Sequence, residues 1–170
     1  MSKIVSGNWK MNGSKADLDN WFKSFFEAAK NYESSRKLTN DEIPTIILCV
    51  PSIFIEYAQN QAEKYNKETN FIKVNIGAED CHYENSGAFT GNTSPVFVKE
   101  FGCKYTLVGH SERREFQKET SEIVAKKAIA ALNNGLTPLV CIGESLSDRE
   151  AGTHFKFIGE QVIASTEGVE

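Results

Sequence analysis

Short runs of apolar and β-branched residues recur along the chain, and each is followed by a stretch in which apolar positions repeat with the period of an α-helix. Such runs, bounded by polar turns, are typical of buried strands. The first helical stretch carries an apolar stripe formed by Leu18, Trp21, Phe22, Phe25 and Phe26. The pattern predicts strands over 4–11, 43–50, 71–78, 105–108 and 137–142, and further helices over 53–67, 95–101, 118–134 and 149–165.

This alternation of strand and helix predicts right-handed βαβ units, whose strands lie parallel in one sheet covered by helices. Nearly continuous apolar strands fit that arrangement, because a parallel sheet is buried on both faces. The segment 79–94 is too rich in polar residues and glycine for a helix, so we expect a protruding loop there. No composition break or repeat divides the chain, which is interpreted as a single domain over 1–170. Five units are compatible with an open sheet or with part of a closed barrel.

Composition narrows the class of protein without identifying a function. Of 170 residues, 40% are hydrophobic and 25% are charged, and the formal net charge is −4, as in an ordinary globular protein. Mild acidity gives no reason to expect nucleic acid or a membrane surface as a partner. The N-terminus lacks the apolar core of a secretion signal, and no apolar run reaches the roughly 18 residues of a transmembrane helix. Four widely spaced cysteines without a CxxC pair favour a reduced, cytoplasmic protein and no metal site.

Polar side chains gather where predicted strands end, which is where α/β folds place their chemistry. Asn8 and Lys10 lie two residues apart, so strand alternation predicts that both project from one face. The same parity places His110 in line with Thr106 and Val108. A lysine in a turn is usually a solvated charge. Because Lys10 is flanked by Trp and Met on a strand expected to be central, an anionic ligand is predicted beside it.

The fourth strand is followed by the most concentrated polar cluster, His110-Ser-Glu-Arg-Arg114. A lone histidine is more often structural than catalytic, and both interpretations of His110 stay open on the residues alone. The two arginines could be surface charge. Alternatively, an arginine could pair with Glu112, or with Glu144 after the fifth strand, and brace the site from behind.

Four segments together resemble the triosephosphate isomerase family. They read GNWKMNG at 7–13, GAEDCHYENSGAFTG at 77–91, VGHSERRE at 108–115 and LVCIGE at 139–144. Their order and their spread over most of the chain make the resemblance specific. It implies a (β/α)8 barrel, of which this chain would supply about the first five βα units. It also implies a cytoplasmic enzyme of glycolysis and gluconeogenesis, usually a homodimer, that interconverts dihydroxyacetone phosphate and glyceraldehyde 3-phosphate without a cofactor.

The resemblance also implies roles for individual residues. Lys10 would attract the dianionic substrate and stabilise the enediolate, and Asn8 would hydrogen-bond a substrate oxygen. His110 would polarise the carbonyl as a neutral imidazole, a use of histidine for which this family is a standard illustration. Glu112 matches an acidic residue that contacts the lysine or handles protons. The loop 81–91 matches the dimerisation loop, with Thr90 near its tip reaching the partner's active site.

One departure from the family is large. Isomerisation removes a proton from carbon and needs a base held against the substrate. In the family that base is a glutamate in a motif reading roughly AYEPVW, which does not occur in these 170 residues. The lid and the later phosphate-binding loops are also missing. We therefore expect the chain alone to be inactive. The alternative is a non-catalytic oligomerisation or anion-binding module derived from that enzyme.

Overall fold

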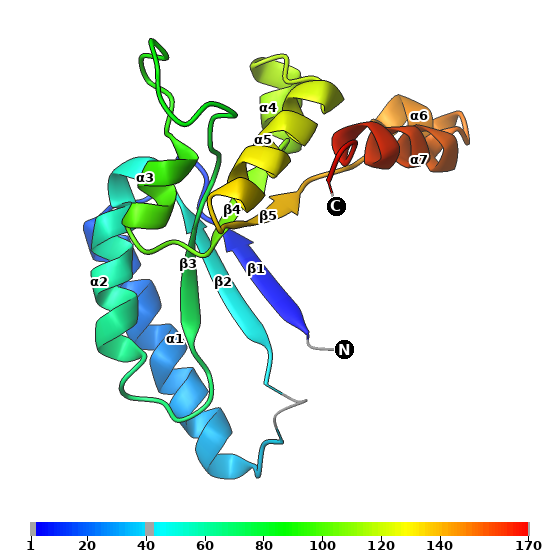
Figure 1. The fold of residues 1–170 in the computed structure, drawn as a ribbon. Coiled ribbons are helices and arrows are strands. Elements are labelled where there is room, and N and C mark those ends of the chain that lie inside the picture. Colours follow the sequence, from blue (N-terminus) through cyan, green and yellow to red (C-terminus); the bar gives the residue numbers. More distant parts are fainter. Residues whose placement is uncertain (1–2, 40–42, 170) are drawn as a thin grey trace. The chain divides into compact units, whose positions relative to one another are not determined.

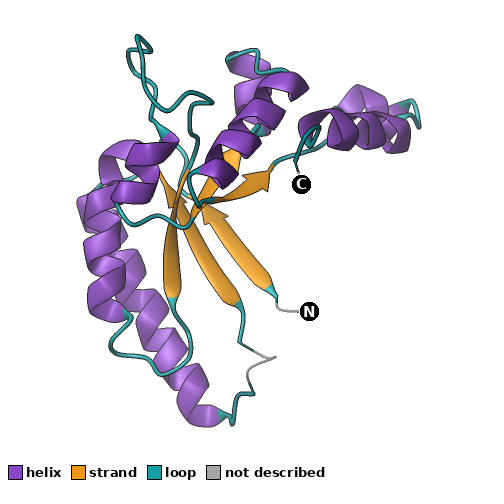
Figure 2. Ribbon diagram, viewed as in Figure 1, coloured by secondary structure: helices purple, strands orange, loops and turns teal. Residues whose placement is uncertain are grey.

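The computed structural model describes residues 3–39 and 43–169 and contains an α/β fold (Figures 1 and 2). The strands, in chain order across the sheet, are β1 (Ile4–Asn8), β2 (Thr45–Val50), β3 (Val74–Ala78), β4 (Tyr105–Val108) and β5 (Thr137–Val140). The helices are α1 (Lys15–Ser35), α2 (Ile55–Tyr65), α3 (Pro95–Glu100), α4 (Ser111–Phe116), α5 (Ser121–Asn133), α6 (Leu146–Glu150) and α7 (His154–Ser165). A 3-10 turn, η2 (Ser52–Phe54), precedes α2. The predicted βα alternation is confirmed.

Contacts group the chain into two compact units. One unit comprises Met1–Glu79 with Val98–Tyr105, and the other comprises Asp80–Phe97 with Thr106–Glu170. The prediction that residues 1–170 form a single domain concerns cooperative unfolding, which this grouping of contacts does not test, and it stays a prediction.

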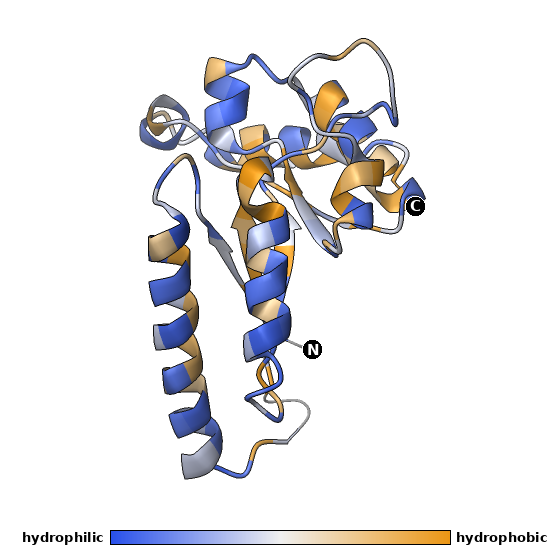
Figure 3. Cartoon of the chain, turned by 90° about the vertical axis from the view of Figure 1, so that its left-hand side faces the viewer, coloured by the Kyte–Doolittle hydropathy of each residue, from blue (hydrophilic) through white to orange (hydrophobic). Residues whose placement is uncertain are grey.

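In the first unit, β1, β2 and β3 pair in parallel, with Ile4 opposite Thr45 and Ile46 opposite Val74. The helices α1 and α2 pack against each other beside these strands (Figure 2). The apolar stripe of α1 faces α2, as the hydropathy colouring in Figure 3 shows, and its members Leu18, Phe22 and Phe26 are fully buried. The apolar stripe predicted from the sequence therefore supplies three core residues, and its other members, Trp21 and Phe25, are half-buried.

The first strand is shorter and more exposed than its sequence suggests. It ends at Asn8 instead of Met11, because Lys10 adopts a left-handed backbone conformation with φ 57° that a strand cannot continue through. It lies at the edge of the sheet, so the expectation of a central strand was wrong. Accordingly, Ile4 is 58% exposed, and Met11, expected to be buried, is 97% exposed.

Glu33, near the end of α1, ties that helix to the segment before β3. Its carboxylate accepts backbone N–H bonds from Asn70, Phe71 and Ile72 at 2.9, 3.0 and 2.6 Å. Burial acts to raise the pKa of Glu33, but the three N–H bonds outweigh it, so the pKa is lowered. A lowered pKa means that this carboxylate contributes stability above its unfolded pKa of about 4.3, and that the contribution is lost as the pH falls through the folded pKa.

We expect Glu33→Gln to lower the free energy of unfolding by about 1 kcal/mol at neutral pH, because glutamine keeps one acceptor oxygen but loses the charge. The loss should shrink as the pH falls through the folded pKa of Glu33, where the wild-type carboxyl also becomes neutral. Urea unfolding across that pH range measures the effect. Glu27→Gln, at an exposed position of the same helix, is the matched control. Equal losses in both variants would contradict the assignment.

The second unit shows two local differences from the predicted elements. Residues Ser111–Phe116, interpreted only as a polar cluster, form the short helix α4. The single helix predicted over 149–165 is divided into α6 and α7, because Gly152 at φ 71° ends the first of them. The expected loop is confirmed, since the structure has no helix or strand between Ala78 and Pro95 among the described residues (Figure 1).

The four cysteines are all free thiols. Burial raises the pKa of Cys103 to about 12, and burial together with the nearby Asp80 raises the pKa of Cys81 to about 11. Both thiols therefore stay protonated and behave as small apolar side chains. Within residues 3–39 and 43–169, no helix is long and apolar enough to cross a membrane.

Candidate functional site

His110 lies at the point where β4 gives way to α4. Strand alternation stops at Val108, because Gly109 takes a left-handed conformation with φ 70°. Parity along the strand therefore does not place the imidazole, contrary to the sequence argument. Instead, His110 is the N-cap residue of α4: its carbonyl accepts the backbone N–H of Arg113 and of Arg114 at 2.8 and 3.0 Å. The side chain is held by the start of a helix and not by a strand.

The imidazole itself takes part in this cap. Its Nδ1 accepts the backbone N–H of Glu112 at 3.3 Å, which requires an unprotonated Nδ1. In a neutral ring the proton then resides on Nε2. The Glu112 carboxylate lies 3.5 Å from the same Nδ1, and it would become the partner if that nitrogen were protonated. The bond from the Glu112 N–H is part of the helix start, whereas the Glu112 side chain is nearly half exposed.

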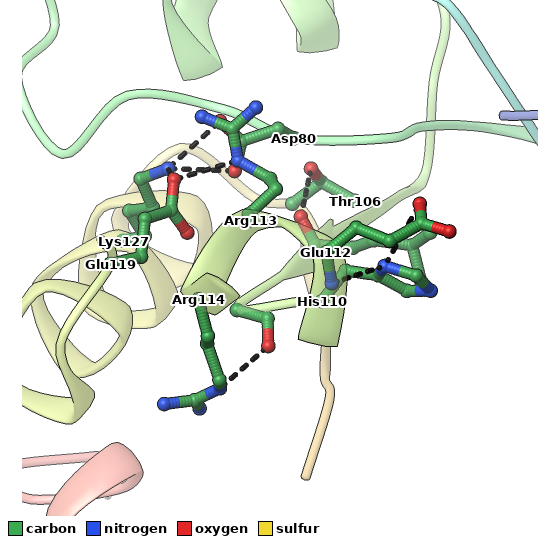
Figure 4. A network of polar contacts seen from close by, with 10 residues as sticks. Asp80, Thr106, His110, Glu112, Arg113, Arg114, Glu119 and Lys127 are labelled. Carbon is green, nitrogen blue, oxygen red and sulfur yellow. Dashed lines mark hydrogen bonds and ion pairs between the residues drawn. The ribbon is translucent and has the colours of Figure 1, made fainter. Parts of the chain in front are cut away.

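Arg113 belongs to a network of four charges behind the His110 loop (Figure 4). Its guanidinium contacts Asp80 at 2.9 Å and Glu119 at 2.6 Å. The ammonium of Lys127 bonds both Asp80 carboxylate oxygens at 2.8 Å and also Glu119. The arginine thus braces this region through Asp80 and Glu119. Two cations and two carboxylates balance in charge, which lets the network be buried.

The network shifts the pKa of its carboxyls in opposite directions. Burial raises the pKa of Asp80, and Lys127 and Arg113 only partly oppose that effect. At Glu119 burial also acts to raise the pKa, but hydrogen bonds from Lys127 and Arg113 outweigh it and the pKa is lowered. The hydrogen bonds from Lys127 and Arg113 therefore hold Glu119 ionised.

Sequence reasoning did not identify Asp80, Glu119 or Lys127. A signal for the lysine was present: Lys127 follows Val124 by three residues and precedes Ala131 by four, so it occupies the buried stripe of α5. A lysine on such a stripe needs a carboxylate partner. Nothing local indicated which one, because Asp80 is 47 residues away.

Glu144 and the loop after β3 lie elsewhere in the second unit. Glu144 pairs with Arg149 at 2.7 Å instead of bracing the histidine. Thr90 is exposed in the loop 81–91. That loop is closed on itself by a bond from His82 N–H to the Thr93 carbonyl at 2.8 Å, and the His82 ring lies 4.2 Å from the ring of Phe89. The loop is thus an ordered projection with its tip residues in solvent.

Asn8 and Lys10 belong to the first unit and form a turn at the end of β1. The Lys10 N–H donates to Asn8 Oδ1 at 3.0 Å, so the group that Asn8 can offer to a ligand oxygen is its Nδ2 donor. Trp9, between these two residues, is half-buried and belongs to the same turn. Its Nε1 donates to the Asn12 carbonyl at 2.8 Å and closes the same turn. The left-handed Lys10 is an outlier of the kind that clusters at functional sites.

A metal centre finds no support in the geometry. Within the part of the chain that the structure describes, no group of three or more His, Cys, Asp or Glu side chains is placed to hold a metal ion. The second unit offers an imidazole beside a network of charged side chains, and the first unit offers an amide and an ammonium in one turn.

Comparison with known proteins identifies the family of this chain. The family model described as triosephosphate isomerase matches residues 3–170. A triosephosphate isomerase of Psychromonas ingrahamii is 42% identical over 164 residues, covering 95% of this chain and 58% of the relative. One from Lactobacillus delbrueckii subsp. bulgaricus is 39% identical, covering 98% of this chain and 60% of the relative.

The same family appears among solved structures. The crystal structure of triosephosphate isomerase from Bartonella henselae superposes with a TM-score of 0.81 at 28% identity, covering all of this chain and 64% of that one. This match confirms that the α/β fold corresponds to part of a TIM barrel. The chain spans less than two thirds of the length of the relatives it matches. On the match over residues 3–170, the chain belongs to the triosephosphate isomerase family.

Proposed function

We propose that the protein containing this chain interconverts dihydroxyacetone phosphate and glyceraldehyde 3-phosphate, and that these residues supply the groups that stabilise a negative oxygen but not the base. The observation that carries the proposal is the His110 imidazole, whose Nδ1 accepts the Glu112 N–H and whose Nε2 proton is thereby left to donate. Family membership supports the choice of substrate.

The reaction explains how these side chains can stabilise the negative oxygen, although they do not remove the proton from carbon. When a proton leaves carbon, the neighbouring carbonyl oxygen becomes negative. An N–H from His110, the amide of Asn8 and the ammonium of Lys10 all interact more strongly with that oxygen in the transition state than with the neutral carbonyl. Glu112, two residues after His110, has a proton-handling role. Arg113 supports the His110 loop through Asp80 and Glu119.

The base is the group that this chain does not provide. Loss of a positioned acid–base group forfeits about 10²- to 10⁴-fold in rate, and loss of the phosphate-binding loops adds to that. Glu167 and Glu170 lack the context of the family's base motif and receive no role. In the proposed assembly the protein is a cytoplasmic homodimer, and the exposed loop tip with Thr90 meets a second copy.

We expect the 170-residue chain to show isomerase turnover near background with glyceraldehyde 3-phosphate. In a separate titration it should bind the unreactive analogue glycerol 3-phosphate weakly, because Lys10 and His110 are present without the later phosphate loops. Lys10→Ala should weaken that binding about tenfold, the effect of losing one charged hydrogen bond. Lys23→Ala, which removes an exposed cation on α1, is the matched control.

The outcomes separate the candidate functions. Turnover well above background would mean that another carboxylate in this chain serves as base. That result would contradict the proposal that the chain stabilises the negative oxygen but does not supply the base. Saturable binding that depends on Lys10, without turnover, also fits a non-catalytic anion-binding module. Turnover by a longer chain carrying the base motif would then decide for the isomerase. Binding equally insensitive to Lys10→Ala and Lys23→Ala would remove Lys10 from the site.

A further inference from the structure

Arg114 is the most connected side chain near His110. Its Nε donates to the Gly109 carbonyl at 2.7 Å, and Nη2 donates to the Cys141 carbonyl at 3.1 Å. Nη1 donates to Ser121 Oγ at 3.1 Å, and Nη2 also donates to Ser165 Oγ at 3.0 Å. Four of the five N–H groups of the guanidinium are therefore used, and they join the ends of β4 and β5 to α5 and α7.

All four acceptors are neutral oxygens, which distinguishes Arg114 from its neighbour Arg113. Figure 4 shows the two side chains leaving α4 in different directions, with Arg113 facing Asp80 and Lys127. Burial lowers the pKa of Arg114, against the opposing effect of Cys141 and Glu119. A half-buried cation held by neutral acceptors gains little from charge pairing. The planar guanidinium, with N–H groups that point at four separate acceptors, is therefore more important at residue 114 than the positive charge.

The bond to Gly109 acts directly on the histidine, because the Gly109 carbonyl belongs to the peptide that leads into His110. That peptide is held on one side by Arg114 Nε, and the His110 carbonyl is held by the first N–H groups of α4. Because the backbone is held both before and after His110, the imidazole ring stays directed at the Glu112 N–H. A shifted peptide would leave Nδ1 free to take a proton and turn to the Glu112 carboxylate 3.5 Å away.

We infer that Arg114 is a positioning residue: by clamping the Gly109 carbonyl to the end of β5, it keeps His110 Nδ1 against the Glu112 amide and leaves the ring proton on Nε2. The functional meaning of that proton rests on the proposed isomerase activity, in which Nε2 donates to the substrate oxygen. The positioning itself is a property of the chain without substrate. The bond from Arg114 to Gly109 therefore does more than stabilise the fold, because it determines which nitrogen of His110 carries the proton.

Imidazole ¹⁵N NMR on the whole chain, at a pH where histidine is neutral, tests the inference. Wild-type His110 should show an unprotonated Nδ1 and a protonated Nε2. In Arg114→Gln the ratio of Nδ1–H to Nε2–H tautomers should rise about five- to tenfold, as expected when roughly one hydrogen bond is lost. His82, whose Nδ1 accepts the Glu84 N–H at 2.9 Å without any link to Arg114, is the internal reference and should not change.

The double variant Ser121→Ala with Ser165→Ala is the matched control. It removes two of the four bonds of Arg114 but keeps those to the carbonyls of Gly109 and Cys141, so it should lower stability and leave the tautomer of His110 unchanged. Arg114→Lys, which keeps a cation and can reach one carbonyl, provides an intermediate tautomer ratio if Arg114→Gln does not fold. A wild-type tautomer pattern in folded Arg114→Gln or Arg114→Lys overturns the inference. Because no substrate is used, failure of the proposed activity would not alter this readout.

Discussion

Lys127→Met is expected to lower the free energy of unfolding by about 3–5 kcal/mol, because it leaves the buried Glu119 and the half-buried Asp80 sharing one arginine. Lys127 is 3% exposed, and it contacts Asp80 and Glu119 at the centre of the charge network. Methionine fills a similar volume, so the loss reports the unpaired charges and not a cavity. Chemical denaturation at neutral pH measures it. Lys126→Met, at the exposed position next to it on α5, should change stability by no more than about 1 kcal/mol.

The pH dependence of this loss follows from the same carboxylates. In the wild type the pKa of Glu119 is lowered, so its contribution is present above the unfolded pKa of about 4.3 and is lost only as the pH falls further. In the variant the unpaired carboxyls instead favour protonation, so the deficit should narrow between about pH 7 and pH 5. Adding Asp80→Asn should restore part of the stability. A deficit that is independent of pH and unaffected by Asp80→Asn would show that the charges are not its cause.

Gly109→Ala is expected to cost about 2–4 kcal/mol, the sum of a left-handed backbone penalty and steric overlap. The added Cβ would lie 2.5 Å from Val124 Cγ2 and 2.9 Å from Arg114 Nη2. Val124 is fully buried, so it has no room to move away. Because Gly109 precedes His110, the same substitution should also disturb the imidazole signals described above. Thermal and chemical unfolding measure the stability loss.

Gly152→Ala provides the control, because Gly152 has nearly the same φ of +71° but no heavy atom within 4 Å of an added Cβ. It should show only the backbone penalty, about 1–2 kcal/mol. The difference between the two variants is then the steric part. Combining Gly109→Ala with Val124→Ala should recover some of that part, although Val124→Ala opens a cavity of its own. Identical losses for Gly109→Ala and Gly152→Ala would mean that close packing at the His110 loop is not what requires glycine.

The sequence predicted the elements whose signal lies in local periodicity. The fourth strand was predicted at Tyr105–Val108 with the observed bounds, and the apolar stripe was predicted on the helix that is α1. It missed α4, because the cap of that helix is a histidine side chain and not one of the usual serine, threonine or aspartate caps. It also extended β1 through Lys10, since a left-handed lysine leaves no mark in the apolar pattern.

For the candidate site, the sequence by itself determined which side chains are available, and the motifs around Asn8, Lys10 and His110 predict groups that could stabilise a negative oxygen. Only the tertiary structure decided the partners. It paired Arg113 with Asp80 and Glu119, Glu144 with Arg149, and Arg114 with the carbonyls of Gly109 and Cys141. The physical reason is that periodicity along a chain encodes which face of an element is buried, whereas a charged side chain takes its partner from whatever acceptor the packed elements bring within hydrogen-bonding distance.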